Sequence, residues 1–454
     1  MVPGSRNAEL AAAHNYMEQE FFLSGRANVY RYTPARQLEV GMAGVPYTTR
    51  LLITLPRDPT QFNGKVYLTP FHPQRGMGFW EAIRDYVYRE GDAWVGIMVG
   101  TDERSREASV QGEPVDAVGV LHAWSPERYA SINWPRDDGI RWDVFGQVAR
   151  LLRADDTANP MHDLKIKNLY ALGWSFTGSL LRTFINEGFH DKYRQASGAP
   201  AIDGYLVGIS NYHFISGYVP INSKTPPLGV DDPRRIPKPV DVPVIELMTE
   251  NEAVTKSIHP VAQRDTGIGR YRVYEVPGLT HGDGLHDDSG PSDCPFPQSD
   301  VPFRQITWAV LENLDLWVRE GIPPPMAQPL EVNPGRGQAV KDGMGNALGG
   351  IRPAQIAVPL ASYDSPADHR CQPRAPHYLA IRRIPLNPEK FQQLYPGGPA
   401  ESGRDGGRPS EGRGVDPRGE CVGLVGDRRA IVLVLAPADI VDAVGARTGG
   451  KSGL

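Results

Sequence analysis

Cysteine is scarce in this chain: among 454 residues the only cysteines are Cys294, Cys371 and Cys421. They lie far apart and form neither a CxxC motif nor an even-numbered set. Neither a disulfide framework nor a cysteine-based zinc site is therefore predicted. Unpaired cysteines fit a reduced compartment best, so we expect a cytoplasmic protein.

The chain also lacks an excess of positive charge and any long apolar run. Its formal net charge is -5, whereas a nucleic-acid partner would favour clustered lysines and arginines. No run approaches the roughly 18 apolar residues that a membrane-spanning helix needs. The first 20 residues are small and polar, which argues against a signal peptide. We therefore expect neither a nucleic-acid partner nor a membrane partner.

Nucleotide-binding glycine motifs are missing as well. No GxGxxG run lies between a strand-like and a helix-like segment. The sequence therefore supports neither a dinucleotide-binding site nor a phosphate-binding loop. We expect no cofactor.

What the chain does contain is an alternation of two hydrophobic patterns. Strands that are apolar throughout, alternating with amphipathic helices, predict a mostly parallel sheet with helices on both faces. The fold class is therefore α/β, with a doubly wound sheet. The strand-like runs lie at residues 50–55, 65–69, 93–99, 168–173, 204–207, 244–248 and 271–276, and the helical patterns at 78–90, 142–154, after Ser175 and at about 304–320.

Two long stretches interrupt this alternation, and the C-terminal third departs from it. Residues 101–135 and 210–242 are long enough to be lids over a site. Residues 322–396 form an extension that is rich in proline and glycine. Residues 397–454 begin with a charged, glycine-rich segment, and we expect this tail to be partly disordered.

One short motif lies at the junction of a predicted strand and a predicted helix. It reads GWSFTG at residues 173–178 and has Ser175 at its centre. A serine between glycines at such a junction is typical of a nucleophile elbow, in which the hydroxyl stands clear of the sheet. The general elbow pattern has glycine at position 177, where this chain has threonine, and the glycine follows one place later as Gly178.

A serine nucleophile needs a base that removes its proton and an acid that orients the base. In doubly wound folds these partners follow in the order serine, acid, histidine, each at the end of a later strand. Glu250 and Glu252 follow one predicted strand, and His281 follows the next. We predict that Ser175, Glu252 and His281 are catalytic. Glu250 is the second candidate for the acid, although it could instead cap the following turn.

The negative charge that develops on a reacting carbonyl oxygen needs N–H donors. One donor is expected from Phe176, directly after the serine, and a second from the loop that follows the predicted strand at residues 65–69. Pro70 and Pro73 in that loop have no N–H. We therefore predict that Phe71 supplies the second donor.

Two more residues are candidates for the substrate pocket. Trp174 directly precedes the serine, and His72 could line the acyl side of the pocket or be an ordinary loop histidine. The expected substrate is a small-molecule carboxylic ester. Ser175 would attack its carbonyl carbon, and water would then release the acyl group.

Two alternatives remain open. Two histidines and three aspartates between His281 and Asp288 could bind a divalent metal, which would indicate a metal-assisted hydrolase. No HxH or HExxH run completes such a ligand set, so we expect no metal. The third hypothesis is an inactive binding protein of the same fold, in which Trp174 and Phe176 crowd the pocket.

The elbow region resembles that of the bacterial and fungal "alpha/beta hydrolase domain-containing" family. That family's pattern reads Gly-X-Ser-X-X-Gly, then Leu-Arg-Thr, an aromatic residue and a closing Phe-His, and residues 173–190 match it. Further matching segments are EQEFFLSGRANVY from Glu18, AWVG from Ala93, WVR with a following glycine and three prolines from Trp317, and GNALGGIR from Gly345.

The resemblance covers about residues 15–396. It implies an α/β-hydrolase domain over that range with an esterase-like site at Ser175, Glu252 and His281, and it places a glycine at position 178, as found here. The chain departs from the family after the predicted strand at 65–69, where the family commonly has an acidic or amide residue. Residues 397–454 also do not continue the family's helical ending and would be a divergent tail.

Overall fold

The structure is a computed structural model. It describes residues 8–73, 80–100, 117–135, 137–210, 218–222, 224–226, 228–229, 232–255, 262–281, 294–333, 337–364 and 381–396. The predicted tail at residues 397–454 lies outside the described residues, as do residues 101–116 of the first predicted lid.

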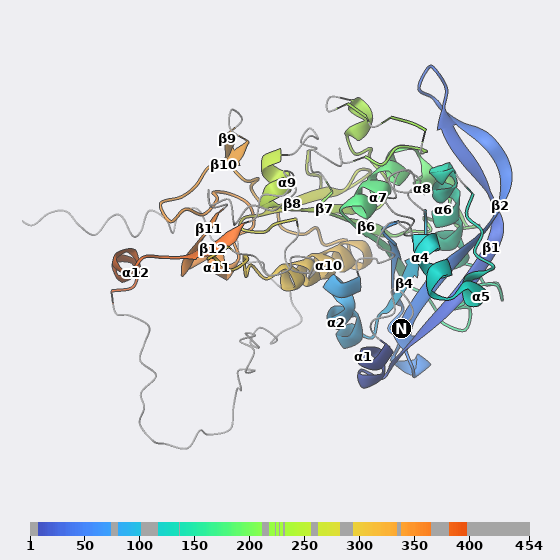
Figure 1. Ribbon diagram of the computed structural model, residues 1–454, viewed down its shortest axis with the longest axis horizontal. Coiled ribbons are helices and arrows are strands. Elements are labelled where there is room, and N and C mark those ends of the chain that lie inside the picture. Colours follow the sequence, from blue (N-terminus) through green and yellow to red (C-terminus); the bar gives the residue numbers. More distant parts are fainter. Residues whose placement is uncertain are drawn as a thin grey trace, which may run out of the picture.

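A sheet of eight strands runs through the molecule in the order β1-β2-β4-β3-β5-β6-β7-β8 (Figure 1). From β4 to β8 all neighbouring strands are parallel, whereas β2 runs antiparallel to both β1 and β4. The prediction of a mostly parallel α/β sheet is confirmed. The strands are β1 (Tyr16–Tyr32), β2 (Leu38–Pro56), β3 (Lys65–Pro70), β4 (Ala93–Ile97), β5 (Asn168–Trp174), β6 (Gly204–Gly208), β7 (Val244–Thr249) and β8 (Tyr271–Val276).

Helices cover both faces of this sheet (Figure 1). The helices α2 and α10 pack against each other on one face, and α6, α7 and α8 pack on the other. The helices are α1 (Ala8–Ala13), α2 (Trp80–Glu90), α4 (Ala117–Trp124), α5 (Pro126–Tyr129), α6 (Arg141–Leu151), α7 (Phe176–Asn186), α8 (Phe189–Lys192), α9 (Glu250–Thr255), α10 (Phe303–Glu320), α11 (Ala354–Ala357) and α12 (Pro388–Leu394). Short 3-10 helices within the described residues lie at Pro59–Gln61, Asp138–Ile140 and Pro233–Arg235.

Hydrophobic burial explains why the central strands form where they do. Every residue of β4, β6 and β7 is buried, as expected for parallel strands that are covered on both faces. The helix α10 buries one stripe, which includes Ile306, Val310, Leu314 and Trp317, and it ends at Gly321 in the left-handed conformation. Each such side chain contributes about 1.5–3 kcal/mol when it is fully buried.

The strands β1 and β2 form a long antiparallel hairpin that curves around one edge of the molecule (Figure 1). Only the inner part of β2 was expected from the sequence, because the outer part of the hairpin alternates exposed and half-buried residues. Near the turn of the hairpin, the hydroxyl of Tyr32 donates a hydrogen bond of 2.6 Å to Glu187, just after α7. The turn is therefore tied to the helix layer.

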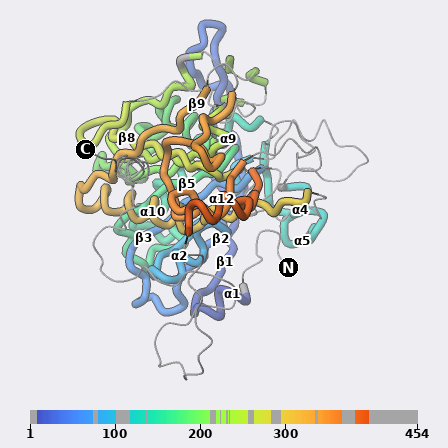
Figure 2. The backbone as a smooth tube through the Cα atoms, turned by 90° about the vertical axis from the view of Figure 1, so that its left-hand side faces the viewer, coloured from blue at the N-terminus to red at the C-terminus, as the bar shows by residue number. Residues whose placement is uncertain are grey.

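The C-terminal extension packs against β8 and against the helix α9, which follows β7. It contains the short strands β9 (Val332–Asn333), β10 (Gln338–Ala339), β11 (Ala361–Asp364) and β12 (Arg382–Pro385). Figure 2 is viewed from that side and shows β9 beside α9, two elements that are in contact. The backbone N–H of Ile351 donates to the carbonyl of Glu275 in β8 at 2.7 Å, so the extension is joined directly to the sheet.

Cys294 is disulfide-bonded, and its partner lies outside the described residues. The cysteine spacing did not predict this bond, because it predicted no disulfide framework. Because disulfides persist mainly in oxidising compartments, the cysteine content no longer argues for a cytoplasmic location. Within the described ranges, no helix combines the length and the apolar character needed to cross a membrane.

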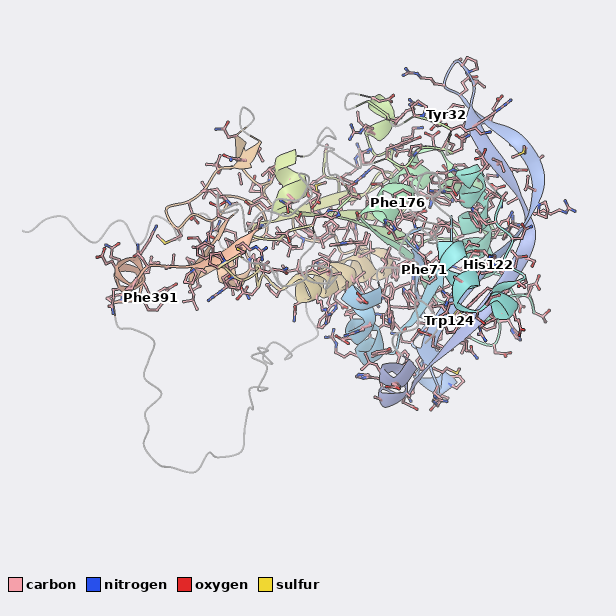
Figure 3. All side chains as sticks on the ribbon, viewed as in Figure 1. Tyr32, Phe71, His122, Trp124, Phe176 and Phe391 are labelled. Atoms are coloured by element: carbon pink, nitrogen blue, oxygen red, sulfur yellow. The ribbon has the colours of Figure 1, made fainter. Side chains whose placement is uncertain are left out.

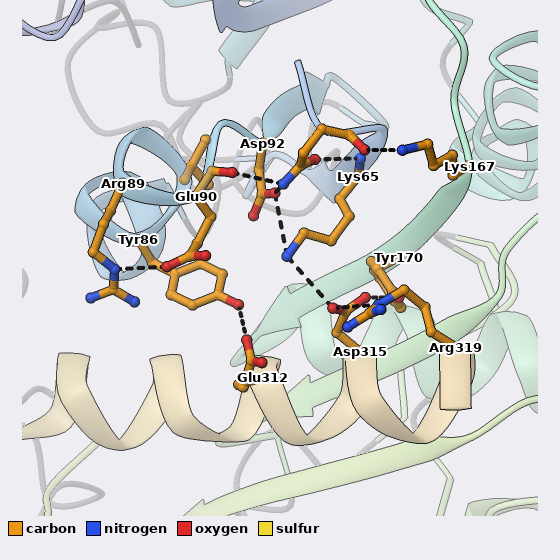
Figure 4. Close-up of polar contacts among 12 residues, drawn as sticks. Lys65, Tyr86, Arg89, Glu90, Asp92, Lys167, Tyr170, Glu312, Asp315 and Arg319 are labelled. Atoms are coloured by element: carbon orange, nitrogen blue, oxygen red, sulfur yellow. Dashed lines mark hydrogen bonds and ion pairs between the residues drawn. The ribbon is translucent and has the colours of Figure 1, made fainter. Parts of the chain in front are cut away.

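A buried cluster of charges lies between the starts of β3 and β4 and the helix α10 (Figure 4). The ammonium of Lys65 lies 3.4 Å from Asp92 Oδ1 and 3.6 Å from Asp315 Oδ2. Tyr170 donates a hydrogen bond of 2.5 Å to Asp315. Burial raises the pKa of Asp92 to about 7, although the nearby Lys65 opposes the shift.

Candidate active site

The backbone turns sharply where β5 ends and α7 begins. Ser175 forms this turn with φ 55° and ψ −120°, a conformation that is strained for a residue with a side chain. The backbone N–H of Ser175 donates to the carbonyl of Gly208 in β6 at 3.0 Å, and the carbonyl of Ser175 accepts from Ser179 N at 3.0 Å. The turn is thus held from both the sheet and the helix.

Close backbone contacts explain the glycines on either side of Ser175. A Cβ atom on Gly173 would lie 2.4 Å from the carbonyl oxygen of Thr177. A Cβ atom on Gly178 would lie 2.7 Å from the carbonyl oxygen of Gly208 in the neighbouring strand. Both distances are too short for a side chain, so this elbow requires glycine at 178.

Thr177 has a structural role that the motif alone does not reveal. Its hydroxyl donates to the carbonyl of Trp174 at 2.9 Å and accepts from the backbone N–H of Trp174 at 2.8 Å. The threonine thus satisfies both backbone groups of the residue before Ser175. The only signal in the sequence was the departure from the general pattern at this position.

The structure brings Ser175, His281 and Glu252 into one hydrogen-bonded line. Ser175 Oγ lies 2.9 Å from Nε2 of His281, and Nδ1 of His281 lies 2.5 Å from Oε1 of Glu252. Glu252 is fully buried, and its second oxygen accepts hydrogen bonds from the backbone N–H and the hydroxyl of Thr249. Such an arrangement can draw a proton from the serine hydroxyl.

Glu250 lies close by but faces other partners. Its Oε2 accepts from the backbone N–H of Gly278 at 2.8 Å, and its Oε1 accepts from the ammonium of Lys341 at 2.5 Å. Of the two glutamates, it is therefore Glu252 that contacts the imidazole of His281.

The backbone N–H groups of the two predicted oxyanion donors differ in their hydrogen bonding. Phe176 is the first residue of α7, and the first N–H groups of an α-helix have no acceptor within the helix. The N–H of Phe71, in contrast, donates to the carbonyl of Ile97 at 2.7 Å. Because this N–H is used to join β3 to β4, the prediction of Phe71 as a donor is wrong.

Aromatic and cationic side chains surround Phe176, which Figure 3 marks together with Phe71. The ring centroid of the half-buried His72 lies 5.4 Å from that of Phe176, and the guanidinium of Arg141 lies 5.8 Å from it. Trp174 is only 8% exposed, and its ring centroid lies 4.5 Å from that of Phe303, which is a core contact. Of the two predicted pocket residues, His72 is therefore the one that lies beside Phe176.

The proposed metal segment falls mostly outside the described residues, which include His281 but not residues 282–288. Among the described residues, one group has the spacing of metal ligands, and it consists of His190, Asp191 and Asp241. Arg194 donates to both aspartates, at 2.6 and 2.8 Å. The guanidinium thus already offsets part of their negative charge.

The predicted lids are described only in part. Residues 117–135 of the first contain α4 and α5, and residues 232–242 of the second contain the 3-10 helix Pro233–Arg235. A lid function for either segment stays a prediction.

Comparison with known families gives a match that extends over most of the chain. Residues 2–400 match a family model described as "Alpha/beta hydrolase domain". No curated protein matches the chain.

Solved structures provide further likenesses at low identity. A dienelactone hydrolase from Anabaena variabilis is 10% identical, with 66% of this chain and 98% of that chain covered and a TM-score of 0.30. The esterase Est22 is 10% identical, with 63% and 79% covered and a TM-score of 0.31. A prolyl endopeptidase is 11% identical with a TM-score of 0.28, and the match covers 57% of this chain but only 35% of the endopeptidase. At these values the likenesses do not bear on the substrate.

Proposed function

The chain belongs to the alpha/beta hydrolase domain family, and from the site described above we propose that it is a serine hydrolase that cleaves a small carboxylic ester. Ser175 would be the nucleophile, His281 the general base and Glu252 the acid that orients the histidine. The observation that carries this proposal is the unbroken line of hydrogen bonds from Ser175 through His281 to the buried Glu252.

The chemistry follows from these contacts. Ser175 Oγ attacks the ester carbonyl carbon while His281 Nε2 takes the hydroxyl proton. The carbonyl oxygen becomes an oxyanion, for which the N–H of Phe176 is a donor. His281 then gives its proton to the departing alkoxide, and an acyl-enzyme forms. Water, deprotonated by the same histidine, attacks the acyl group and releases the acid and free Ser175.

Labelling with a fluorophosphonate, which reacts with activated serines, tests the nucleophile. We expect the wild type to be labelled and Ser175→Ala not to be labelled. Ser179→Ala is a matched control, because Ser179 lies in the same helix and its hydroxyl donates to the Ser210 carbonyl at 3.0 Å. Labelling that persists in Ser175→Ala would reject the proposed nucleophile.

Substrate class needs a second measurement. Hydrolysis of p-nitrophenyl esters of increasing chain length would give the size of the acyl pocket, and peptidyl p-nitroanilides would test for amide cleavage. We expect turnover of the esters only. Turnover by Ser175→Ala that is lost with a chelator would favour the metal-assisted alternative, and a folded wild type that neither turns over ester nor reacts with the probe would favour a binding protein.

A further inference from the structure

The loop that carries His281 is held by three consecutive residues at the start of α9. The backbone N–H of Glu250 donates to the Leu279 carbonyl at 3.0 Å, and its side chain accepts from the Gly278 N–H at 2.8 Å. The side chain of Asn251 accepts from the backbone N–H of His281 at 3.1 Å. The position of His281 therefore depends on where residues 250 and 251 lie, in addition to its own contact with Glu252.

A lysine of the C-terminal extension reaches this point from outside the sheet. The ammonium of Lys341 lies 2.5 Å from Oε1 of Glu250, 3.3 Å from the Tyr363 carbonyl and 3.4 Å from Asp364 Oδ1. It thus has one acceptor for each of its three protons. Glu250 is only 6% exposed, and a buried carboxylate that lost its cation would be strongly destabilised.

The turn that contains Lys341 is held by hydrogen bonds to Asp342 and from Arg352. Asp342 accepts from the backbone N–H groups of Met344 and Asn346, both at 2.9 Å. The guanidinium of Arg352 donates to Asp342 at 3.1 Å and to the Ala347 carbonyl at 2.8 Å. These hydrogen bonds therefore hold the turn, and with it Lys341, in a fixed position next to Glu250.

We propose that Lys341 is a positioning residue for the hydrolase reaction, acting through Glu250 on the loop that carries His281. This proposal rests on the proposed function, since it concerns the placement of the proposed general base. The two carboxylate oxygens of Glu250 have different partners. Oε2 accepts a hydrogen bond from Gly278 at the start of the loop, and Oε1 accepts one from Lys341. The positive charge also offsets Glu250, so that a second uncompensated carboxylate does not lie beside Glu252.

Replacing the lysine should therefore lower kcat rather than substrate binding. For Lys341→Met we expect kcat for a short p-nitrophenyl ester to fall about 10- to 100-fold, because small displacements of a catalytic group have effects of that size. KM should change less than about threefold. Lys341→Arg, which keeps the charge, should recover most of kcat. Lys390→Met is the matched control, because Lys390 contacts the Gly343 carbonyl in the same turn, and it should leave kcat unchanged.

A double-mutant cycle separates positioning from a general loss of stability. Gly278 and Lys341 contact different oxygens of Glu250, and a glutamine would place an NH2 group, which only donates, at one of the two positions. Glu250→Gln alone should therefore lower kcat. In that background Lys341→Met should add less than about a threefold loss, because its partner is already compromised. Equal losses in both backgrounds would overturn the proposal, as would wild-type kcat in Lys341→Met.

Two further outcomes are distinguishable. If Lys341→Met does not fold, Lys341→Gln, which keeps a donor without the charge, takes its place with the same expected loss of kcat, and wild-type kcat in that variant also overturns the proposal. Turnover that survives in Ser175→Ala rejects the proposed function itself. An inactive Ser175→Ala together with a fully active Lys341→Met rejects only the role of Lys341.

Discussion

Thr177 shows how one side chain can replace a glycine in a tight turn. Its hydroxyl bridges both backbone groups of Trp174, and the close approach to β6 falls to Gly178 instead. Thr177→Val keeps the shape but leaves these two buried groups without the hydroxyl. We expect the free energy of unfolding to fall by about 1–3 kcal/mol, measured by urea denaturation. Thr177→Ser keeps the hydroxyl and should be close to wild type; equal stability of the valine variant would contradict this account.

The two glutamates near His281 should differ in their effect on catalysis. Glu252→Ala removes the carboxylate that contacts the imidazole and should lower kcat by about 10³- to 10⁴-fold. Glu250→Ala removes a contact to Gly278 and a partner of Lys341, so kcat should fall less and stability should fall as well. Ester turnover and thermal unfolding of both variants test this, and the opposite order of kcat would make Glu250 the acid.

The residues of the site that could be predicted are those that follow strands in chain order. Ser175, Glu252 and His281 each come just after an apolar strand, and the structure brings them together. Phe71 was misjudged because its N–H is used by Ile97, a register contact that no local pattern reveals. Lys341 was missed because it lies 91 residues beyond Glu250 in the chain.

At the scale of elements, apolar content decided which strands could be foreseen. The strands β3 to β8 are buried on both faces, and each was expected close to its observed place. The strand β1 and the outer part of β2 were not, because their half-exposed residues carry a weaker signal. The helix α4 was also missed, since it lies inside a stretch read as a lid.

The buried charged cluster of Lys65, Asp92 and Asp315 makes the free energy of unfolding depend on pH. Burial raises the pKa of Asp92 from 3.8 to about 7, so the folded protein keeps a proton that the unfolded chain releases in this window. Stability contributed by Asp92 is therefore present at low pH and is lost as pH rises from about 4 to 7, by at most about 1.4 kcal/mol per pH unit. Asp92→Asn should flatten this slope in urea denaturation across the window. Asp163→Asn, whose side chain is 87% exposed, is the control, and an unchanged slope in Asp92→Asn would contradict the assignment.

At the scale of the whole molecule, the C-terminal extension packs against the edge strand β8 and the helix α9 near the site. The backbone N–H groups of Leu330 and Ile351 donate to Glu275 of β8 at 2.6 and 2.7 Å. Leu330, Ala339 and Ala347 form a small apolar cluster with Ala253 of α9. Glu252 and His281 thus follow segments that the extension contacts on one side.

Two truncations test this view. A chain that ends at residue 400, where the family match ends, should keep its kcat/KM within about threefold and its unfolding temperature. A chain that ends at Gly321 loses Lys341, the two backbone donors to Glu275 and the apolar contacts of Ala253 with the extension. We expect that shorter chain to unfold at lower temperature and to lose fluorophosphonate labelling. Circular dichroism and labelling measure both effects. Full activity in the shorter chain would show that the sheet holds Glu252 and His281 in place without the extension.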